Sequence, residues 1–193
     1  MTDNYTPQER ALLLDLARRT LDAITHRQPA PTVDLSALPA ALCEPRACFV
    51  TMRYRSDGAL RGCTGTLVAR RPLAEEVIYM TEQTAFHDPR FEPVMASDVD
   101  DLHLEISVLT PSQPLDFDSP EDLIAQLRPN VDGVTLKFDH RRATFLPQVW
   151  ESYSDPKVFL SLLSQKMGAA PDTWRSPRLE VETYQAVIIE EEF

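Results

Sequence analysis

Residues 47–69 read ACFVTMRYRSDGALRGCTGTLVA, and this stretch decides the class of fold. Residues 47–55 have the β-branched and aromatic character of a strand, and Ser56–Gly58 supplies turn residues. Residues 59–69 then read as the returning strand, so the pair is predicted to form a β-hairpin. The returning strand places Gly62 and Gly65 on either side of Cys63, which raises the question of what this cysteine does.

Helical signals flank the hairpin on both sides. Thr6 and Glu9 make a T-x-x-E capping box with a proline in the first turn, so a helix is expected from there to about His26. A second helix is expected to begin at Pro72 and to end near Phe86, where an Asp-Pro pair disfavours further helix.

The rest of the chain alternates in the same way between strand and helix signals. Leu104, Ile106 and Val108 are predicted to share one strand face, opposite Glu105 and Ser107. The other predicted elements are a short helix at 119–127, a hairpin at 132–147, a helix at 155–168 and one closing strand at 179–191. Hairpins interleaved with separate helices predict an α+β fold with a mainly antiparallel sheet and flanking helices.

Composition narrows the class of protein. The chain has 193 residues, enough for one domain or one domain with two lobes, and a net charge of −11. Such an acidic chain is a poor candidate for binding nucleic acid, which needs clustered Lys and Arg. The N-terminal MTDNYTPQER is polar and unlike a signal peptide, and no apolar run approaches the ~20 residues that cross a bilayer. Three cysteines without CxxC spacing favour a reducing cytoplasm.

Most catalytic sequence templates do not match. GxSxG, P-loop, GxGxxG and HExxH motifs are absent. Residues 103–105, HLE, imitate the H-x-E of zinc deaminases, but the PCxxC that completes their zinc site is missing. Residues 62–65, GCTG, match the GxxG loop of KH domains, yet here they lie in a predicted strand of an acidic chain. No metal site and no cofactor are therefore expected.

Cys63 has two interpretations. It is a small buried residue in a tight bend, with glycines permitting close contact between chains. Alternatively, Gly62 and Gly65 let a ligand approach the backbone, and the positive charge of Arg61 favours the thiolate. In a regular strand Arg61, Cys63 and Gly65 would share one face, but only if no bulge intervenes.

The stretch HDPRFEP, residues 87–93, also allows two interpretations. Asp88 and Arg90 pair to lock a loop, or His87, Asp88 and Arg90 line a site for an anionic ligand. Glu105 and Ser107 usually belong to the solvent face of a half-buried strand, and they gain interest only if another element covers that face. We predict that the LRGC and HDPRF stretches meet around one cleft.

Five stretches of this chain occur in the order and approximate spacing of a known family. They are LRGCTGTL (60–67), HDPRFEPV (87–94), LEISVL (104–109), DGVTL (132–136) and ATFLPQVW (143–150). The chain thereby resembles the AMMECR domain family, whose bacterial and archaeal members are also called AmmeMemoRadiSam system protein A. The resemblance covers residues 8–190 as a single domain after a tail at 1–7. It departs from the family at Thr64, where isoleucine is common.

The resemblance implies an α+β fold of two unequal lobes, the larger built on an antiparallel sheet. It also implies partner proteins, because relatives are encoded beside a Memo-like protein and a radical S-adenosylmethionine enzyme. It supplies no reaction. The positions that match the family's motifs are Arg61, Gly62, Cys63, Gly65, Thr66, Asp88, Pro89, Arg90, Phe91, Glu105 and Ser107.

Two hypotheses for function follow. The favoured one is a cytoplasmic binding module that holds a small molecule, a peptide or a partner loop around the LRGC motif. Its candidate ligand-binding residues are Arg61, Gly62, Gly65, Thr66, His87, Asp88, Arg90, Glu105 and Ser107. The alternative is an enzyme in which Cys63 is a thiolate nucleophile in group transfer, Arg61 or Arg90 holds an anionic substrate, and Glu105 or His87 handles protons.

Overall fold

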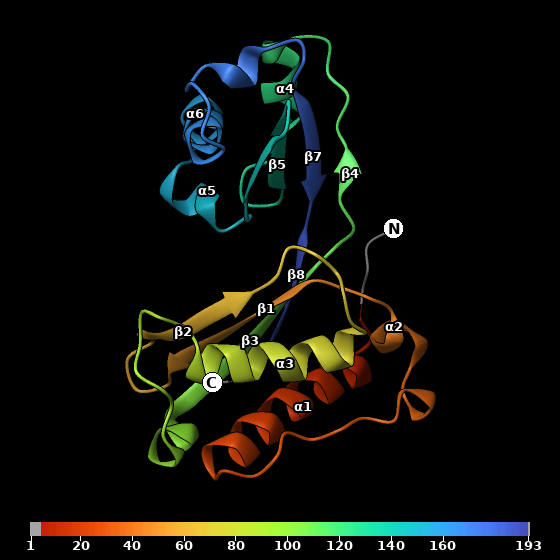
Figure 1. Ribbon diagram of the computed structural model, residues 1–193, viewed down its shortest axis with the longest axis vertical. Coiled ribbons are helices and arrows are strands. Elements are labelled where there is room, and N and C mark those ends of the chain that lie inside the picture. The colour runs from red at the N-terminus through yellow and green to blue at the C-terminus, as the bar shows by residue number, and fades with distance from the viewer. Residues whose placement is uncertain (1–4, 193) are drawn as a thin grey trace. The chain divides into compact units, whose positions relative to one another are not determined.

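The structure is a computed structural model that describes residues 5–192 (Figure 1). The chain divides into two units, the larger formed by residues up to Leu109 and from Val187 on, the smaller by Thr110–Ala186. Each unit has its own hydrophobic core. The described strands form two four-stranded antiparallel sheets, so the predicted α+β class is confirmed.

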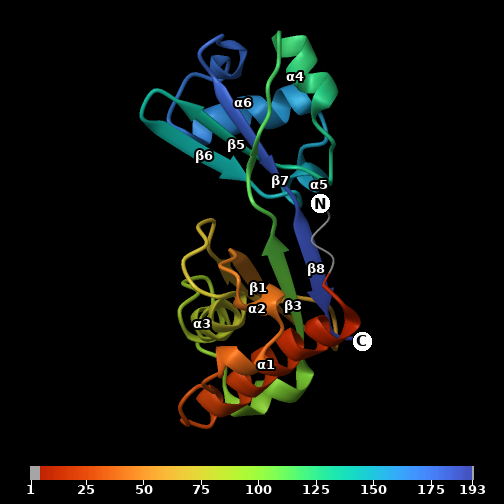
Figure 2. The same ribbon diagram turned by 90° about the vertical axis from the view of Figure 1, so that its right-hand side faces the viewer.

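The first unit is a sheet with helices on one face (Figures 1 and 2). Its strands are β1 (Cys48–Tyr54), β2 (Leu60–Gly65), β3 (Leu102–Leu109) and β8 (Ala186–Glu190), in the order β2-β1-β3-β8. Its two long helices are α1 (Pro7–Thr25) and α3 (Leu73–Phe86). Alternate residues of the strands, such as Val50, Met52, Leu104 and Ile106, are fully buried in the core that the helices complete. Their neighbours along the strands therefore point to the sheet's other face.

The ends of the long helices follow the sequence signals. Thr6 caps α1 with the predicted box, its hydroxyl accepting the Glu9 backbone N–H, and His26 is the C-cap. Residues 1–4 of the predicted tail lie outside the described residues, and Tyr5 is buried in the core. The connection after α1 contains the short helices η1 (Leu35–Ala37) and α2 (Ala40–Cys43), and η2 (Ala96–Asp101) precedes β3.

The second unit packs a second sheet on helices around two tryptophans. Its strands are β4 (Gln113–Pro114), β5 (Gly133–Phe138), β6 (Arg141–Phe145) and β7 (Glu180–Tyr184), in the order β4-β7-β5-β6. Its helices are α4 (Pro120–Gln126), α5 (Val149–Ser152), α6 (Pro156–Lys166) and η3 (Thr173–Arg175). The buried indole of Trp150 stacks on Phe159 with ring centroids 3.6 Å apart and donates to the Asp132 carbonyl.

Two predicted strands have different ends in the structure. The single closing strand predicted at 179–191 is wrong, because it divides at Gln185 into β7 and β8, which belong to different sheets. Gln185 and Thr110 explain the division: the Gln185 N–H donates to the Thr110 hydroxyl, and the Thr110 N–H donates to the Gln185 carbonyl. The returning strand of the first hairpin ends at Gly65, four residues earlier than predicted.

Candidate functional site

Asp88 and Arg90 close the outer edge of β2. Oδ2 of Asp88 accepts the backbone N–H of Cys63 at 2.9 Å, and Nη2 of Arg90 donates to the Cys63 carbonyl at 2.9 Å. Since β2 is the last strand of its sheet, these two backbone groups have no further strand to pair with. The two side chains take the place of a neighbouring strand, and the prediction that the LRGC and HDPRF stretches meet is confirmed.

Asp88 and Arg90 also lock onto each other. Oδ1 of Asp88 accepts the Arg90 backbone N–H at 3.1 Å and its Nε at 2.9 Å, while Oδ2 accepts Nη2 at 2.7 Å. The Asp88 side chain is 2% exposed and that of Arg90 is 54% exposed. The hydrogen bond from Arg90, helped by the Cys63 N–H and outweighing burial, holds the pKa of Asp88 well below its usual range. The carboxylate is therefore ionised throughout the physiological pH range.

Polar side chains form a row across the sheet, on the face opposite α1 and α3. Cys63 on β2 is the register partner of Thr51 on β1, which in turn pairs with Glu105 on β3. The Thr51 hydroxyl donates to the Cys63 sulfur at 3.4 Å, and the Ser107 hydroxyl donates to Oε1 of Glu105 at 3.2 Å. Thr51 and Ser107 are buried, so this is not the open solvent face of an ordinary half-buried sheet. We call these four residues the Cys63 row.

Both glycines of the motif have a packing reason. A Cβ at Gly62 would lie 2.9 Å from Cγ2 of Thr84 on α3, and one at Gly65 would lie 2.3 Å from the ring of Phe49. Thr84 also explains the polar residue at Thr64, because the two hydroxyls are hydrogen-bonded at 2.7 Å. These glycines let β2 pack closely against α3 and Phe49.

Arg61 does not follow the alternation of its strand. The register pairs Met52 with Gly62 and Arg53 with Leu60, so Arg61 is the extra residue of a β-bulge. The condition for Arg61 and Cys63 to share a face, an unbroken strand, is therefore not met. The Arg61 side chain is 8% exposed, and its nearest carboxylate is Asp98, with Nη2 and Oδ2 3.6 Å apart.

Arg61 instead lines an open cavity of about 800 Å³ in the first unit. The other lining residues come from the end of the β1–β2 hairpin, the loop after α3, and η2. Phe91 and Pro93 bring part of the HDPRFEP stretch to this cavity, so both signature stretches contribute to its wall.

The chain matches a family over most of its length. The profile of the family described as AMMECR1 matches residues 14–189. This chain belongs to the AMMECR1 family. It is similar to Protein MK0488 of Methanopyrus kandleri, with 31% identity over 194 residues covering 100% of this chain and 93% of that protein. A protein of Thermofilum pendens is 35% identical over 195 residues, covering 95% of this chain and 90% of its own length.

A solved relative of this AMMECR1-family chain has the same fold. The crystal structure of the uncharacterized protein PH0010 from Pyrococcus horikoshii superposes with a TM-score of 0.78 at 31% identity, covering 94% of this chain and 90% of that one. The names of these relatives assign no activity.

The structure separates the predicted site residues into those that meet and those that do not. Asp88, Arg90 and Cys63 meet at the edge of β2, as described above. His87 is exposed at the C-cap of α3, and the Thr66 hydroxyl bonds to the Val68 carbonyl, away from the Cys63 row. The role of each predicted residue in a site stays a prediction.

Sequence reasoning missed three residues around the motif. Thr51 could have been found from the hairpin, because its register places it beside Cys63. Thr84 and Asp98 carry no comparable signal, since their contacts with Thr64 and Arg61 depend on how α3 and η2 pack against the strand.

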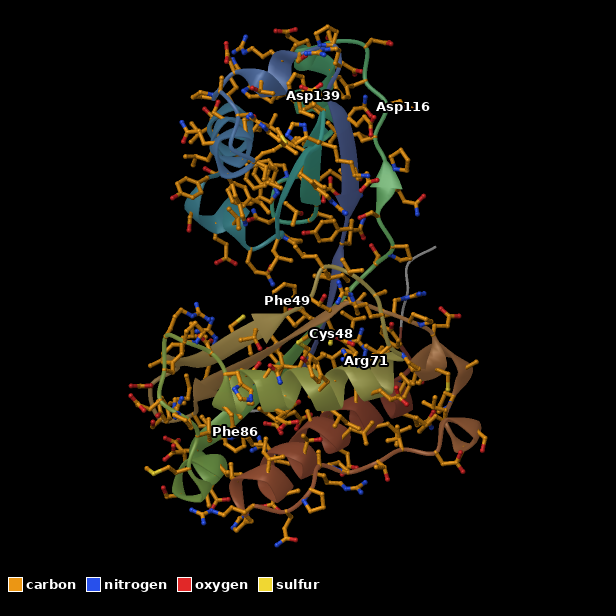
Figure 3. The ribbon with its side chains drawn as sticks, in the orientation of Figure 1. Cys48, Phe49, Arg71, Phe86, Asp116 and Asp139 are labelled. Carbon is orange, nitrogen blue, oxygen red and sulfur yellow. The ribbon has the colours of Figure 1, made fainter. Side chains whose placement is uncertain are left out.

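A second cysteine, Cys48, lies in a different environment. Cys48 and Phe49 are neighbours on β1 and point to opposite faces of the sheet (Figure 3). Burial, with a smaller contribution from the nearby Glu76 carboxylate, raises the pKa of the Cys48 thiol far above its usual range. Glu76 is itself buried and pairs with Arg71 at 3.1 Å. Cys48 is therefore a structural residue of the core.

Two further structural properties bear on function. Among residues 5–192, no group of three or more His, Cys, Asp or Glu side chains is arranged to hold a metal ion. The helices in this part of the chain are also too short or too polar for any of them to cross a membrane.

Proposed function

We propose that this AMMECR1-family protein is a binding module whose site surrounds the LRGC stretch, residues 60–63. One observation carries the proposal: Arg61 and residues 91–93 line the same cavity, where the guanidinium is buried and its Nη1 has no hydrogen-bond partner within the described structure. Burying a charged N–H donor that has no hydrogen-bond partner is costly, so its presence at a cavity wall favours recognition of a ligand over packing alone.

The contacts of Cys63 favour binding over catalysis. The Thr51 hydroxyl donates to the sulfur, and a donor of this kind does not remove a thiol proton. A nucleophile needs a base within about 3 Å, and His87, the nearest histidine in sequence, is exposed at the end of α3. Asp88 is already occupied by four hydrogen bonds, which suits a positioning role.

The alternative function is an enzyme that uses Cys63 as a nucleophile. Two observations favour it: Glu105 lies in the same row of side chains, and Arg90 brings a positive charge to the Cys63 carbonyl. Thiolate attack would then use Glu105 for proton transfer in a group-transfer reaction.

As partners of this binding module we propose a Memo-like protein and a radical S-adenosylmethionine enzyme, on the strength of the family resemblance. Co-purification with each protein from cells that express all three tests this part. Retention of either partner by the wild type, and its loss with Arg61→Gln, is expected; no retention of either partner would contradict it.

The binding function is tested by recovering the wild type, Arg61→Gln and Arg70→Gln from native cells and comparing what co-purifies. Arg70 is an exposed arginine on the neighbouring loop and serves as the matched control. We expect small molecules or proteins that are bound to the wild type and to the Arg70 variant and are lost from the Arg61 variant. Identical material on all three would overturn the proposal.

The enzyme alternative is tested by alkylation of the thiols with iodoacetamide, followed residue by residue by mass spectrometry. Cys43 is half-buried like Cys63 and serves as the comparison. A binding module predicts similar rates for Cys43 and Cys63. Alkylation of Cys63 that is about tenfold faster at pH 7, and slowed by Glu105→Gln, would favour the enzyme instead.

A further inference from the structure

The cavity beside Arg61 has a charge pattern that selects among ligands. Its wall contains one guanidinium, from Arg61, and two carboxylates, from Glu92 and Asp98. A free phosphate or a dicarboxylate would meet the arginine but would also meet two negative charges, which disfavours such anions. A cation without a negatively charged group would be repelled by the positive charge of Arg61, so such ligands are disfavoured as well.

Arg61 is the group best placed to bind a carboxylate. The β-bulge removes it from the regular strand pattern, and its side chain is more than nine-tenths buried. Within the described residues, Nη1 has no hydrogen-bond partner, and the ion pair between Nη2 and Asp98 is long, at 3.6 Å. A guanidinium offers five N–H donors in a planar fork that matches a carboxylate, so the two N–H donors of Nη1 are unused.

Asp98 is held in place by groups other than Arg61. Its Oδ2 accepts the Met95 backbone N–H at 3.1 Å, and its Oδ1 accepts the Ser97 hydroxyl at 3.3 Å. Its side chain is 20% exposed, so the carboxylate remains open to a cationic group in the cavity. Glu92 is exposed and adds a second negative charge at the same wall.

The rest of the cavity wall is mainly apolar. Tyr54 and Phe91 contribute aromatic rings, and Met95, which is 63% exposed, contributes a flexible thioether chain. Aromatic and methionine side chains bury apolar groups of varied shape without requiring hydrogen bonds. A ligand therefore needs an apolar portion as well as its charged groups.

We propose that this cavity binds a zwitterionic α-amino acid with an apolar side chain. The carboxylate lies against Arg61, the ammonium group against Asp98 and Glu92, and the side chain against Tyr54, Phe91 and Met95. This inference rests on the proposed binding function of the LRGC region and names its class of ligand.

The ligand class is tested by isothermal titration of the full chain with L-phenylalanine as the probe. Three compounds are titrated in parallel: 3-phenylpropionate, which lacks the ammonium group, 2-phenylethylamine, which lacks the carboxylate, and inorganic phosphate. We expect saturable binding of one L-phenylalanine per chain, and binding of the other three weaker by about tenfold or more. Equal binding of 3-phenylpropionate or phosphate would overturn the zwitterion assignment.

Variants place the site on the protein. Arg61→Gln and Asp98→Asn are each expected to weaken L-phenylalanine binding by about tenfold, and Arg70→Gln to leave it unchanged. Met95→Asp tests the same cavity at a side chain that is 63% exposed, and it is expected to weaken binding similarly by placing a charge on the apolar part of the wall. Circular dichroism confirms that each variant is folded. Wild-type affinity in the folded Arg61 and Met95 variants would refute this site.

Failure of this inference is distinguishable from failure of the proposed function. If L-phenylalanine does not bind, while Arg61→Gln still loses material that co-purifies from native cells, the ligand class is wrong and the binding function stands. If Arg61→Gln retains all of that material, the binding function itself fails.

Discussion

Replacing Asp88 by asparagine tests whether the contact between the two signature stretches holds the edge of β2. The carboxylate accepts four hydrogen bonds, one from Cys63 and three from Arg90. The single carbonyl oxygen of Asn accepts at most two of them, and the variant has no charge to pair with Arg90.

The size of the effect follows from these contacts. A hydrogen bond to a charged group contributes about 1.5–3 kcal/mol, but Arg90 is half exposed and regains hydrogen bonds from water. We therefore count mainly the loss at the part-buried Cys63 N–H and expect Asp88→Asn to destabilise the first unit by about 2 kcal/mol. For a protein of this size that corresponds to a fall of about 4–8 °C in Tm.

The effect of Asp88→Asn depends on pH in a defined direction. The pKa of Asp88 in the folded state is depressed below the value of about 3.9 expected in the unfolded chain. Its stabilisation is therefore complete above about pH 5 and is lost as the pH falls below about pH 4. The difference in stability between wild type and variant is expected to be largest at pH 7 and to shrink at pH 3.

The assay has to report on the first unit. Both tryptophans, Trp150 and Trp174, lie in the second unit, so their fluorescence does not report directly on β2. Hydrogen exchange followed by mass spectrometry resolves residues 60–65 and is expected to show faster exchange in Asp88→Asn at pH 7. Asp100→Asn, at an exposed carboxylate of the same unit, is the control. Wild-type exchange at residues 60–65 in Asp88→Asn would refute the reasoning.

Three other predictions concern packing and burial. Gly65→Ala would place a Cβ 2.3 Å from the Phe49 ring and is expected to lower the free energy of unfolding by about 2–3 kcal/mol. Gly58→Ala, at a φ of +73° but with open space around it, is expected to lower it by about 1 kcal/mol, and urea unfolding followed by circular dichroism measures both. Burial raises the pKa of Tyr184 to about 12, so the stability of the folded state is expected to fall as the pH rises from about 10 to 12. Ultraviolet titration should show one tyrosine that ionises late in the wild type and is missing in Tyr184→Phe. Cys48 is expected to resist iodoacetamide at pH 8 until the chain unfolds, and alkylation of Cys48 at the rate of the half-buried cysteines would contradict its burial.

The sequence by itself determined the local elements of this protein. Three kinds of short-range signal place them: the capping box at Thr6, the turn at residues 56–58 and the proline at the start of each long predicted helix. The helices and hairpins occur where these signals place them. Such signals suffice because capping, turn geometry and apolar periodicity depend on residues only a few positions apart. The α+β class followed from the same information.

Only the tertiary structure decided how those elements are joined and what surrounds the LRGC motif. Residues 179–191 are one run of strand-forming residues, and the exchange of hydrogen bonds between Gln185 and Thr110 determines where it divides between two sheets. The bulge at Arg61 and the contact from Asp88 to Cys63 likewise depend on residues far apart in the chain. Sequence spacing places a side chain on a strand, but strand register and the packing of the loop after α3 determine what that side chain contacts.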